Sequence, residues 1–314
     1  MKYTKLGSTG LEVSSLGFGG APLGSVFGPV SQESAIESVR EAIRLGINFF
    51  DVSPCYGNAE TVLGRALESI PREKFVVSTK CGRYSDGFDF SAQRVLESVD
   101  ESLERLKLDY IDIIHCHDIE FGSLDQVISE TIPALLGLKR QGKVRFIGMS
   151  GLPLAIFRYV LDRVEPGTVD VILSYCHYSL NDSSLEGLIP YLKDKGVGII
   201  TASPLAMGLF TESGPPQWHP APEEIKEACA KAATHCKLKG QNISEIALKF
   251  SLSNPDIAIT LVGMCTTQQV HENIKAMDNL ERSSVDCENI LDEVKEILAP
   301  IKNKTWPCGR PENN

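Results

Sequence analysis

Four residues carry side chains that together suit proton transfer: Asp51, Tyr56, Lys80 and His117. A phenol has an ordinary pKa of about 10, which is too high for ready proton exchange at neutral pH. A neighbouring Lys ammonium stabilises the phenolate and is expected to lower that pKa, while an Asp holds the Lys charged and in place. A His can hydrogen-bond a substrate oxygen and orient it. Such a set moves a proton to or from an alcohol or carbonyl oxygen, and a bound nicotinamide would move the hydride.

Each of the four residues stands at, or just beyond, the carboxyl end of a predicted strand. The apolar run Ile47–Phe50 ends in Asp51, and Tyr56 lies in the loop that follows. Lys80 and His117 end the next two strand-like segments, KFVVSTK and YIDIIHCH. Because the carboxyl ends of parallel strands face the active site in α/β proteins, we expect these side chains to meet there. Taken singly, each also fits an ordinary structural role, so the prediction depends on their joint placement.

Strand-like and helix-like segments alternate along the rest of the chain. Strands are predicted near residues 16, 49, 77, 112, 147, 172, 199 and 260, and helical sequence follows each of them. These units predict a (β/α)8 TIM barrel, an α/β fold that forms a single domain over residues 1–314. A doubly wound sheet is the competing interpretation, but no G-x-G-x-x-G follows the first strand. The turn Gly7–Gly10 predicts an N-terminal β-hairpin, and the segment around Trp306 predicts a C-terminal extension packed across the barrel.

The sequence also predicts the N-terminal caps of two helices and the extent of two others. Ser31 and Ser91 precede amphipathic segments and are predicted to cap them. One uninterrupted helix is expected from about Leu124 to Arg140, and another near Leu185–Lys195, because apolar residues recur there at helical spacing.

The composition narrows the possible partners. The chain has 314 residues and a net charge of −10, which argues against a nucleic acid or an anionic membrane surface and leaves a small molecule as the expected partner. No apolar run approaches the roughly 20 residues that span a membrane. The polar N-terminus MKYTKLGSTGLEV lacks the apolar core of a signal peptide, so we expect a cytoplasmic protein. The nine Cys include no C-x-x-C pair, which favours free thiols in a reducing compartment.

A metal site is an alternative use of the segment His115-Cys116-His117-Asp118. On a strand the two His side chains point to the same side, and His with Cys or Asp can bind zinc. No other His and Cys in the sequence have ligand spacing, so we expect no metal. The sequence leaves the metal interpretation open but disfavours it.

The motifs FDVSPCYGNAETVLGRAL, YIDIIHCHD and LKRQGKVRFIGMSG, together with Lys80, resemble those of the aldo-keto reductases. The resemblance runs from about Lys5 to Asn273 and implies a barrel that binds NAD(P)H without a Rossmann domain. It implies Tyr56 as proton donor or acceptor, Lys80 and Asp51 as the residues that tune it, and His117 as the residue that orients the substrate. The family's His lies five residues after the strand Asp, here Asp112, which selects His117 over His115. Substrate contacts are expected from Tyr56, His117 and Asp118.

The resemblance also implies a set of cofactor contacts, with three departures from the family pattern. The Asn that usually follows Ser150 is Gly151, the usual Gln is Tyr175, and the usual nicotinamide-stacking aromatic is Ala202. The turn Ser203-Pro204-Leu205 is kept, as are residues on the adenosine side. The expected cofactor-binding residues are Gly20, Ser150, Tyr175, Ser203, Leu205, Gly263, Thr266, Gln269, Glu272 and Asn273.

The choice between NAD and NADP follows from charge. A site for the 2′-phosphate of NADP needs Lys or Arg, and residues 256–274 contain neither. Gln269 stands where NADP-using relatives place an Arg, and the Glu272 carboxylate would repel a phosphate. We therefore predict NAD. Thr266 and Gln269 can equally form a capping box for the last barrel helix, and both roles are compatible because helix N-termini bind anions.

Within the family, the resemblance implies oxidation of L-galactose at C1 by NAD to L-galactono-1,4-lactone, a step towards ascorbate. A related aldose dehydrogenase, acting on L-fucose or a D-threo-aldose, is the first alternative, because the loops Gly82–Phe90 and Phe210–Pro222 carry no readable motif. A regulatory subunit that binds nicotinamide is the second. Oligomeric state cannot be predicted from these patterns.

Overall fold

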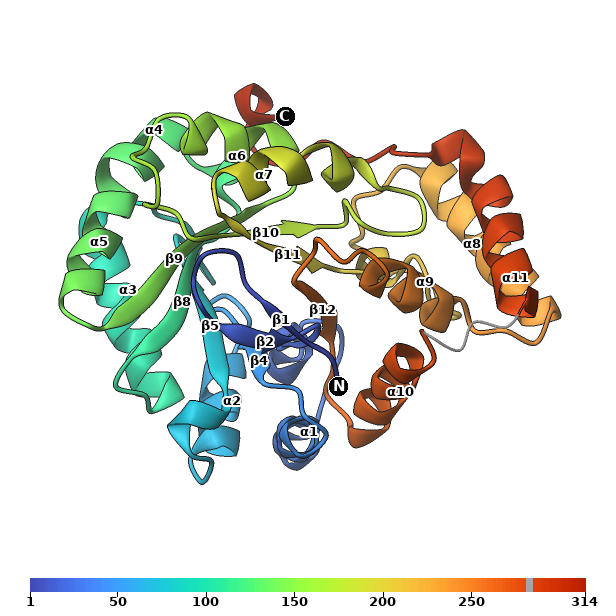
Figure 1. The fold of residues 1–314 in the computed structure, drawn as a ribbon, viewed down its shortest axis with the longest axis horizontal. Helices are drawn as coiled ribbons and strands as arrows, with labels where there is room; N and C mark the ends of the chain where they lie inside the picture. The colour runs from blue at the N-terminus through green and yellow to red at the C-terminus, as the bar shows by residue number, and fades with distance from the viewer. Residues whose placement is uncertain (281–284) are drawn as a thin grey trace.

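The computed structural model describes residues 1–280 and 285–314. Parallel strands close into a barrel in the order β10-β11-β12-β3-β4-β5-β8-β9, which confirms the predicted TIM barrel (Figure 1). All eight strands lie where the sequence predicted them. They are β3 Leu16–Gly19, β4 Phe49–Asp51, β5 Val76–Cys81, β8 Ile111–Cys116, β9 Val144–Gly151, β10 Val171–Tyr175, β11 Gly198–Ala202 and β12 Ile259–Gly263.

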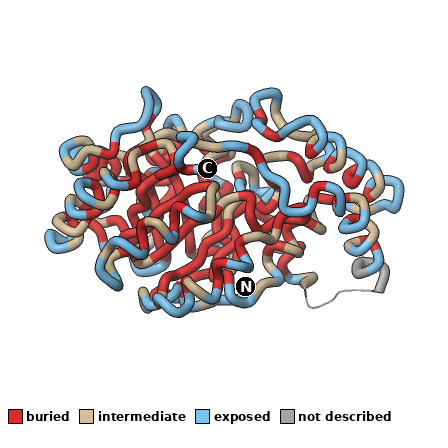
Figure 2. Tube along the Cα trace, turned by 90° about the horizontal axis from the view of Figure 1, so that it is seen from above, coloured by how far each residue is buried: buried red, intermediate tan, exposed pale blue. Residues whose placement is uncertain are grey.

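The side chains that point into the barrel change from apolar to polar along the strands. Near the amino ends, inward side chains such as Phe49, Ile113 and Val171 form an apolar cluster, and hydrophobic burial there stabilises the barrel. At the carboxyl ends the inward positions become polar, as at Asp51 and Lys80, although both side chains are still buried. Figure 2 shows buried residues through the centre of the molecule and exposed residues along its outer edge.

The helices pack around the barrel with their apolar faces inward. Ser31 Oγ accepts a hydrogen bond from Ser34 N at 3.1 Å, and Ser91 Oγ accepts one from Arg94 N at 3.4 Å, so both predicted caps are confirmed. The helices are α1 Gln32–Arg44, α2 Ala59–Leu67, α3 Ala92–Leu106, α4 Leu124–Gln126, α5 Ile132–Arg140, α6 Leu154–Leu161, α7 Ile189–Asp194, α8 Glu223–Leu238, α9 Ile243–Leu252, α10 Thr267–Asp278 and α11 Val285–Leu298.

Two helix predictions were wrong in detail. The expected helix from Leu124 to Arg140 is interrupted by a π-helical turn, Val127–Thr131. Pro133 follows this turn; it has no N–H, and its ring would crowd the carbonyl four residues earlier, so a wider turn relieves the conflict. Near Leu185–Lys195 the chain first forms a 3₁₀ turn, and only Ile189–Asp194 is α-helical, with Pro190 in its first turn.

Two terminal segments pack against the barrel. Strands β1 Tyr3–Lys5 and β2 Glu12–Ser14 pair antiparallel, as predicted, and Leu6 and Val13 pack on the apolar cluster inside the barrel. After α11 the chain crosses the molecule and ends near α4 and α6 (Figure 1). There the backbone N–H of Arg310 donates to Glu120 O at 2.9 Å, so the predicted extension across the barrel is confirmed.

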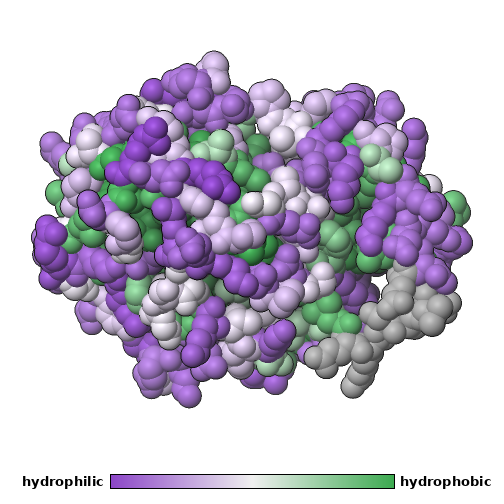
Figure 3. Space-filling model, turned by 45° about the horizontal axis from the view of Figure 1, so that its top comes forward, coloured by the Kyte–Doolittle hydropathy of each residue, from purple (hydrophilic) through white to green (hydrophobic). Residues whose placement is uncertain are grey.

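A small hairpin, β6 Arg83–Tyr84 with β7 Gly87–Phe88, follows β5. It lies inside the loop Gly82–Phe90, for which the sequence predicted no structure. On the face shown in Figure 3, hydrophilic residues cover most of the surface between smaller hydrophobic areas. No helix within residues 1–280 and 285–314 is long and apolar enough to cross a membrane.

Candidate active site

A buried ion pair joins the ends of β4 and β5. Lys80 Nζ contacts Asp51 Oδ1 and donates to Val52 O at 2.8 Å, while Ser78 Oγ donates to Asp51 Oδ2 at 2.8 Å. The two side chains are 2% and 6% exposed. Burial opposes the charge on Lys80, but Asp51 outweighs it, so the pKa of Lys80 stays above its ordinary value. The pair therefore supplies a fixed positive charge inside the barrel mouth.

The ring of Tyr56 lies over this charge. Lys80 Nζ is 4.9 Å from the Tyr56 ring centroid, and the His117 ring meets the Tyr56 ring edge-on with centroids 5.7 Å apart. The expectation of a lowered Tyr56 pKa was wrong for the protein alone. Burial raises the pKa of the phenol above its ordinary value, and the nearby charge of Lys80 offsets only part of that rise. The resting side chain is therefore a neutral phenol.

His117 is held neutral at the same mouth. Its Nδ1 lies 3.0 Å from Ser53 Oγ, and the ring is almost completely buried. Burial lowers the pKa of His117 well below its ordinary value, and the positive charges of Lys80 and Arg83 lower it further. A neutral imidazole can donate from one ring nitrogen and accept at the other, so it can orient an oxygen without taking the proton.

His115 lies deeper in the barrel, paired in register with Lys80. Burial and the Lys80 charge lower the pKa of His115 to about 3, although a backbone hydrogen bond at Met149 opposes that shift. Gly148 makes room for it, because a Cβ there would come within 2.3 Å of His115 Nδ1. Cys116 is directed away from the barrel interior, and nowhere in the described chain do three or more His, Cys, Asp or Glu side chains gather to hold a metal ion.

The residues predicted to bind a cofactor lie around the same mouth. Most of them fall at or just beyond the carboxyl end of a barrel strand: Gly20 after β3, Ser150 in β9, Tyr175 in β10, Ser203 and Leu205 after β11, and Gly263 at the end of β12. Thr266 caps α10, and Gln269, Glu272 and Asn273 lie in the first two turns of that helix. The structure thus brings them to the end of the barrel that holds Tyr56. Their contacts with a cofactor stay a prediction.

Several of these residues already have protein partners. Ser150 Oγ accepts from Asp118 N at 3.0 Å and donates to Asp118 Oδ1 at 3.3 Å. Thr266 Oγ1 caps α10 by accepting from Gln269 N at 3.2 Å. Gln269 Oε1 accepts from Cys265 N at 2.9 Å, one residue before the position that a capping box uses. The cap predicted at Thr266 is confirmed, whereas the reciprocal bond from Gln269 differs by one residue.

Two titratable residues at the mouth, Arg83 and Glu120, were not predicted from the sequence. Arg83, from β6, forms an ion pair with Asp118. Glu120 is fully buried, and burial together with the charge of Asp118 raises its pKa to about 8. Its Oε1 accepts from Leu152 N at 3.0 Å and from Tyr175 Oη at 3.3 Å. The only sequence signal for either residue was its position in a loop that follows a strand.

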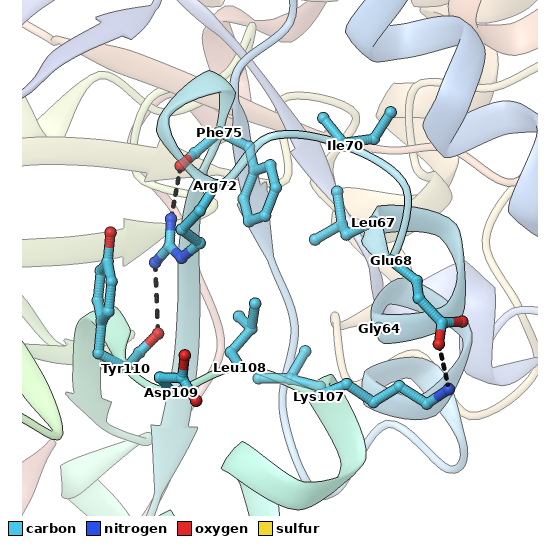
Figure 4. Close-up of a pocket in the computed structure, with 11 residues that line it drawn as sticks. Gly64, Leu67, Glu68, Ile70, Arg72, Phe75, Lys107, Leu108, Asp109 and Tyr110 are labelled. Atoms are coloured by element: carbon cyan, nitrogen blue, oxygen red, sulfur yellow. Dashed lines mark hydrogen bonds and ion pairs between the residues drawn. The ribbon is translucent and has the colours of Figure 1, made fainter.

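A pocket of about 190 Å³ lies away from these residues (Figure 4). Its lining residues include Phe75 and Tyr110, which come directly before β5 and β8. The pocket therefore lies at the amino ends of those strands. Arg72 is drawn there with its hydrogen bonds to the carbonyls of Phe75 and Tyr110. The guanidinium also bonds Asp112 Oδ2 at 2.5 Å, and Arg145 pairs with the other oxygen of the same carboxylate, so Arg72 is held in place by the fold.

Comparison with known proteins extends over nearly the whole chain. A model of the Aldo/keto reductase family matches residues 15–294. The chain is 62% identical over 312 residues to the L-galactose dehydrogenase of Arabidopsis thaliana, covering 98% of both chains. It is 29% identical over 322 residues to the D-arabinose 1-dehydrogenase of Saccharomyces cerevisiae, covering 96% of this chain and 95% of the relative.

Among solved structures, an aldo-keto reductase from Bacillus halodurans, in its holo form, superposes with a TM-score of 0.77. Its sequence identity is 26%, and the match covers 98% of each chain. The closed barrel, the polar residues at its carboxyl-end mouth and the match to residues 15–294 agree with one another. This chain belongs to the aldo/keto reductase family.

Proposed function

We propose that this protein oxidises L-galactose at C1 to L-galactono-1,4-lactone with NAD, as one domain over residues 1–314. The observation that carries the proposal is the buried Asp51–Lys80 pair beside Tyr56 and His117, in a chain 62% identical to an L-galactose dehydrogenase. A role in ascorbate formation and a cytoplasmic location belong to the same proposal and rest on the resemblance.

The mouth suits a dinucleotide. The turn after β11 passes through Ser203, whose φ is +59°. Helix α10 follows its capping residue Thr266, so the backbone N–H groups of its first turn lie at its N-terminus. Helix N-termini and turns of this kind bind anionic groups such as a pyrophosphate. Gly151 and Ala202 place no bulky side chain at the ends of β9 and β11. A bound nicotinamide would supply the acceptor for the C1 hydride.

The protein's own groups would handle the proton. We place the C1 hydroxyl between the Tyr56 hydroxyl and His117, whose neutral ring orients it. Tyr56 accepts the hydroxyl proton in its phenolate form. Lys80, kept cationic by Asp51, stabilises that phenolate. The phenolate is the form of Tyr56 that acts as the base.

Oxidation should accelerate with pH across the neutral range. The active form of Tyr56 is deprotonated, and its pKa lies above the ordinary value, so below that pKa the phenolate fraction rises about tenfold per pH unit. We expect kcat/KM for L-galactose to rise continuously between about pH 7 and pH 9. Steady-state kinetics at saturating NAD would measure it. A plateau already reached near neutrality would contradict this assignment of the base.

Cofactor choice is predicted to depend on Gln269. Glu272 stands one turn away on α10, bonded to Gln268 Nε2 at 2.8 Å, and would repel a 2′-phosphate. We expect the wild type to prefer NAD, and Gln269→Arg to improve NADP use by about tenfold, because Arg pairs with phosphate. Gln268→Arg adds the same charge about 100° around the helix and serves as the control. An equal gain in both variants would show a general charge effect instead of a specific contact.

The function itself is tested by an NADH-forming assay with L-galactose, L-fucose, D-arabinose and D-galactose, each with NAD and with NADP. L-galactose should be the best substrate. A related aldose dehydrogenase is the second candidate, because a matched relative is a D-arabinose 1-dehydrogenase and another is a D-threo-aldose 1-dehydrogenase. Faster turnover of one of the other sugars would select it. No turnover of any sugar would instead favour the nicotinamide-binding regulatory subunit.

A further inference from the structure

The β6–β7 hairpin brings a guanidinium to the proposed reaction centre. Arg83 pairs with Asp118, and Asp118 Oδ2 lies 3.6 Å from His117 Nε2. Burial and the charge of Lys80 lower the pKa of His117, and the charge of Arg83 lowers it further. Arg83 therefore lies within electrostatic reach of His117, the side chain that would orient the C1 oxygen.

Most of the hydrogen-bonding capacity of Arg83 is unused. An Arg side chain has five N–H donors in a planar fork. In the described residues, the guanidinium makes a hydrogen bond only through Nη1, to Asp118, and the side chain is 41% exposed. Asp118 is almost fully buried and is held by Ser150 Oγ at 3.3 Å. The Asp118 carboxylate thus holds the guanidinium of Arg83 through Nη1 and leaves its other N–H donors for a ligand.

An aromatic surface stands next to these donors. Phe88 is 39% exposed and stacks on Phe121 with ring centroids 4.6 Å apart and an interplanar angle of 8°. Arg83 Cζ lies 5.5 Å from the Phe88 ring centroid. An exposed aromatic ring that is already stacked offers rigid apolar area at little entropic cost. A sugar ring has C–H surfaces for such a ring and hydroxyls for a guanidinium.

We propose that Arg83 and Phe88 form the subsite that recognises the sugar ring. Arg83 donates to the C2 hydroxyl, because its partner Asp118 adjoins His117, which we place at the C1 oxygen. Phe88 packs against the C–H surface of the ring. This inference rests on the proposed function, since it assigns substrate contacts within the same site.

The test compares L-galactose with its 2-deoxy analogue. In the wild type we expect kcat/KM to favour L-galactose by about tenfold or more, the size of one hydrogen bond to a charged group. In Arg83→Met that preference should shrink to about twofold or less, because the variant has lost the donor to the C2 hydroxyl. Arg83→Lys keeps the charge beside Asp118 but loses the planar fork, so it should lose most of the preference while remaining folded.

Arg94 offers a matched control. It is also a partly exposed guanidinium, ion-paired with Glu101 and stacked 4.1 Å from the ring centroid of Tyr84. Arg94→Met should keep the full preference, and the Kd for NAD, followed by protein fluorescence, should be unchanged in every variant. Phe88→Ala should raise KM for both sugars alike, by about fivefold, because stacking does not read the C2 hydroxyl.

Two failures are distinguishable. A wild type that oxidises no aldose overturns the proposed function. A wild type that oxidises L-galactose, with an unchanged C2 preference in Arg83→Met and Arg83→Lys, overturns only the assignment of Arg83. A preference lost equally in Arg94→Met would also overturn it, since the effect would then be general.

Discussion

Replacing Tyr56 with Phe should lower kcat for L-galactose oxidation by about a thousandfold or more, because general acid–base catalysis by one side chain contributes about 10² to 10⁴. The variant loses only the hydroxyl that exchanges the proton. The ring keeps its contact with Lys80, 4.9 Å from the ring centroid, and its edge-on contact with His117. The free energy of unfolding should change little, and the Kd for NAD should stay within about twofold.

The measurements are single-turnover kinetics and fluorescence titration with NAD. Tyr191→Phe is the control: its hydroxyl bonds Asp162 Oδ1 at 2.5 Å on the outer layer of helices, so its loss should leave kcat unchanged. Residual activity within about tenfold of the wild type would remove Tyr56 from the proposed proton step. A large rise in the Kd for NAD would instead assign Tyr56 to binding.

The second large effect is expected from Lys80→Met, which should damage both stability and activity. Asp51 would remain as a buried carboxylate with no cation beside it, and removing one partner of a buried pair costs about 3–5 kcal/mol. Turnover should also fall by at least about a hundredfold, because the Tyr56 phenolate loses its stabilising charge. Urea unfolding monitored by circular dichroism and steady-state kinetics would measure the two effects separately.

A double variant separates these two roles of Lys80. Adding Asp51→Asn to Lys80→Met removes the stranded charge, so part of the unfolding free energy should return while activity stays low. Lys193→Met, in an exposed pair with Asp256, should cost less than about 1 kcal/mol and leave turnover intact. Recovery of activity in the double variant would contradict a role for the Lys80 charge in stabilising the phenolate.

The barrel fold and the position of the active site could be predicted from the sequence for one physical reason. Each βα unit buries its own apolar stripe, so the pattern of short apolar runs and amphipathic segments is repeated locally. The polar residue that ends each run then falls at the mouth, and Asp51, Tyr56, Lys80 and His117 could be grouped without knowing any distance. Caps such as Ser31 were equally local, because each bonds a residue three positions away.

The roles of other residues depend on segments far apart in the chain. Arg83 meets Asp118 because β5 and β8 are neighbours in the barrel, and no local pattern marks the hairpin that carries it. Glu120 is covered by the C-terminal extension, whose Asn313 Nδ2 donates to its carbonyl oxygen at 2.8 Å across 193 positions. Such contacts have no periodicity along the chain.

The sequence by itself determined the strands, most of the helices, the polar set at their ends and the family. Tertiary structure alone decided the ionisation of Tyr56 and His117. The motif led to the expectation of a lowered pKa for Tyr56, yet burial outweighs the Lys80 charge and raises it. Residue identity gives the sign of a neighbouring charge, but desolvation depends on how completely the surrounding elements exclude water, which is known only when the barrel is closed around the phenol.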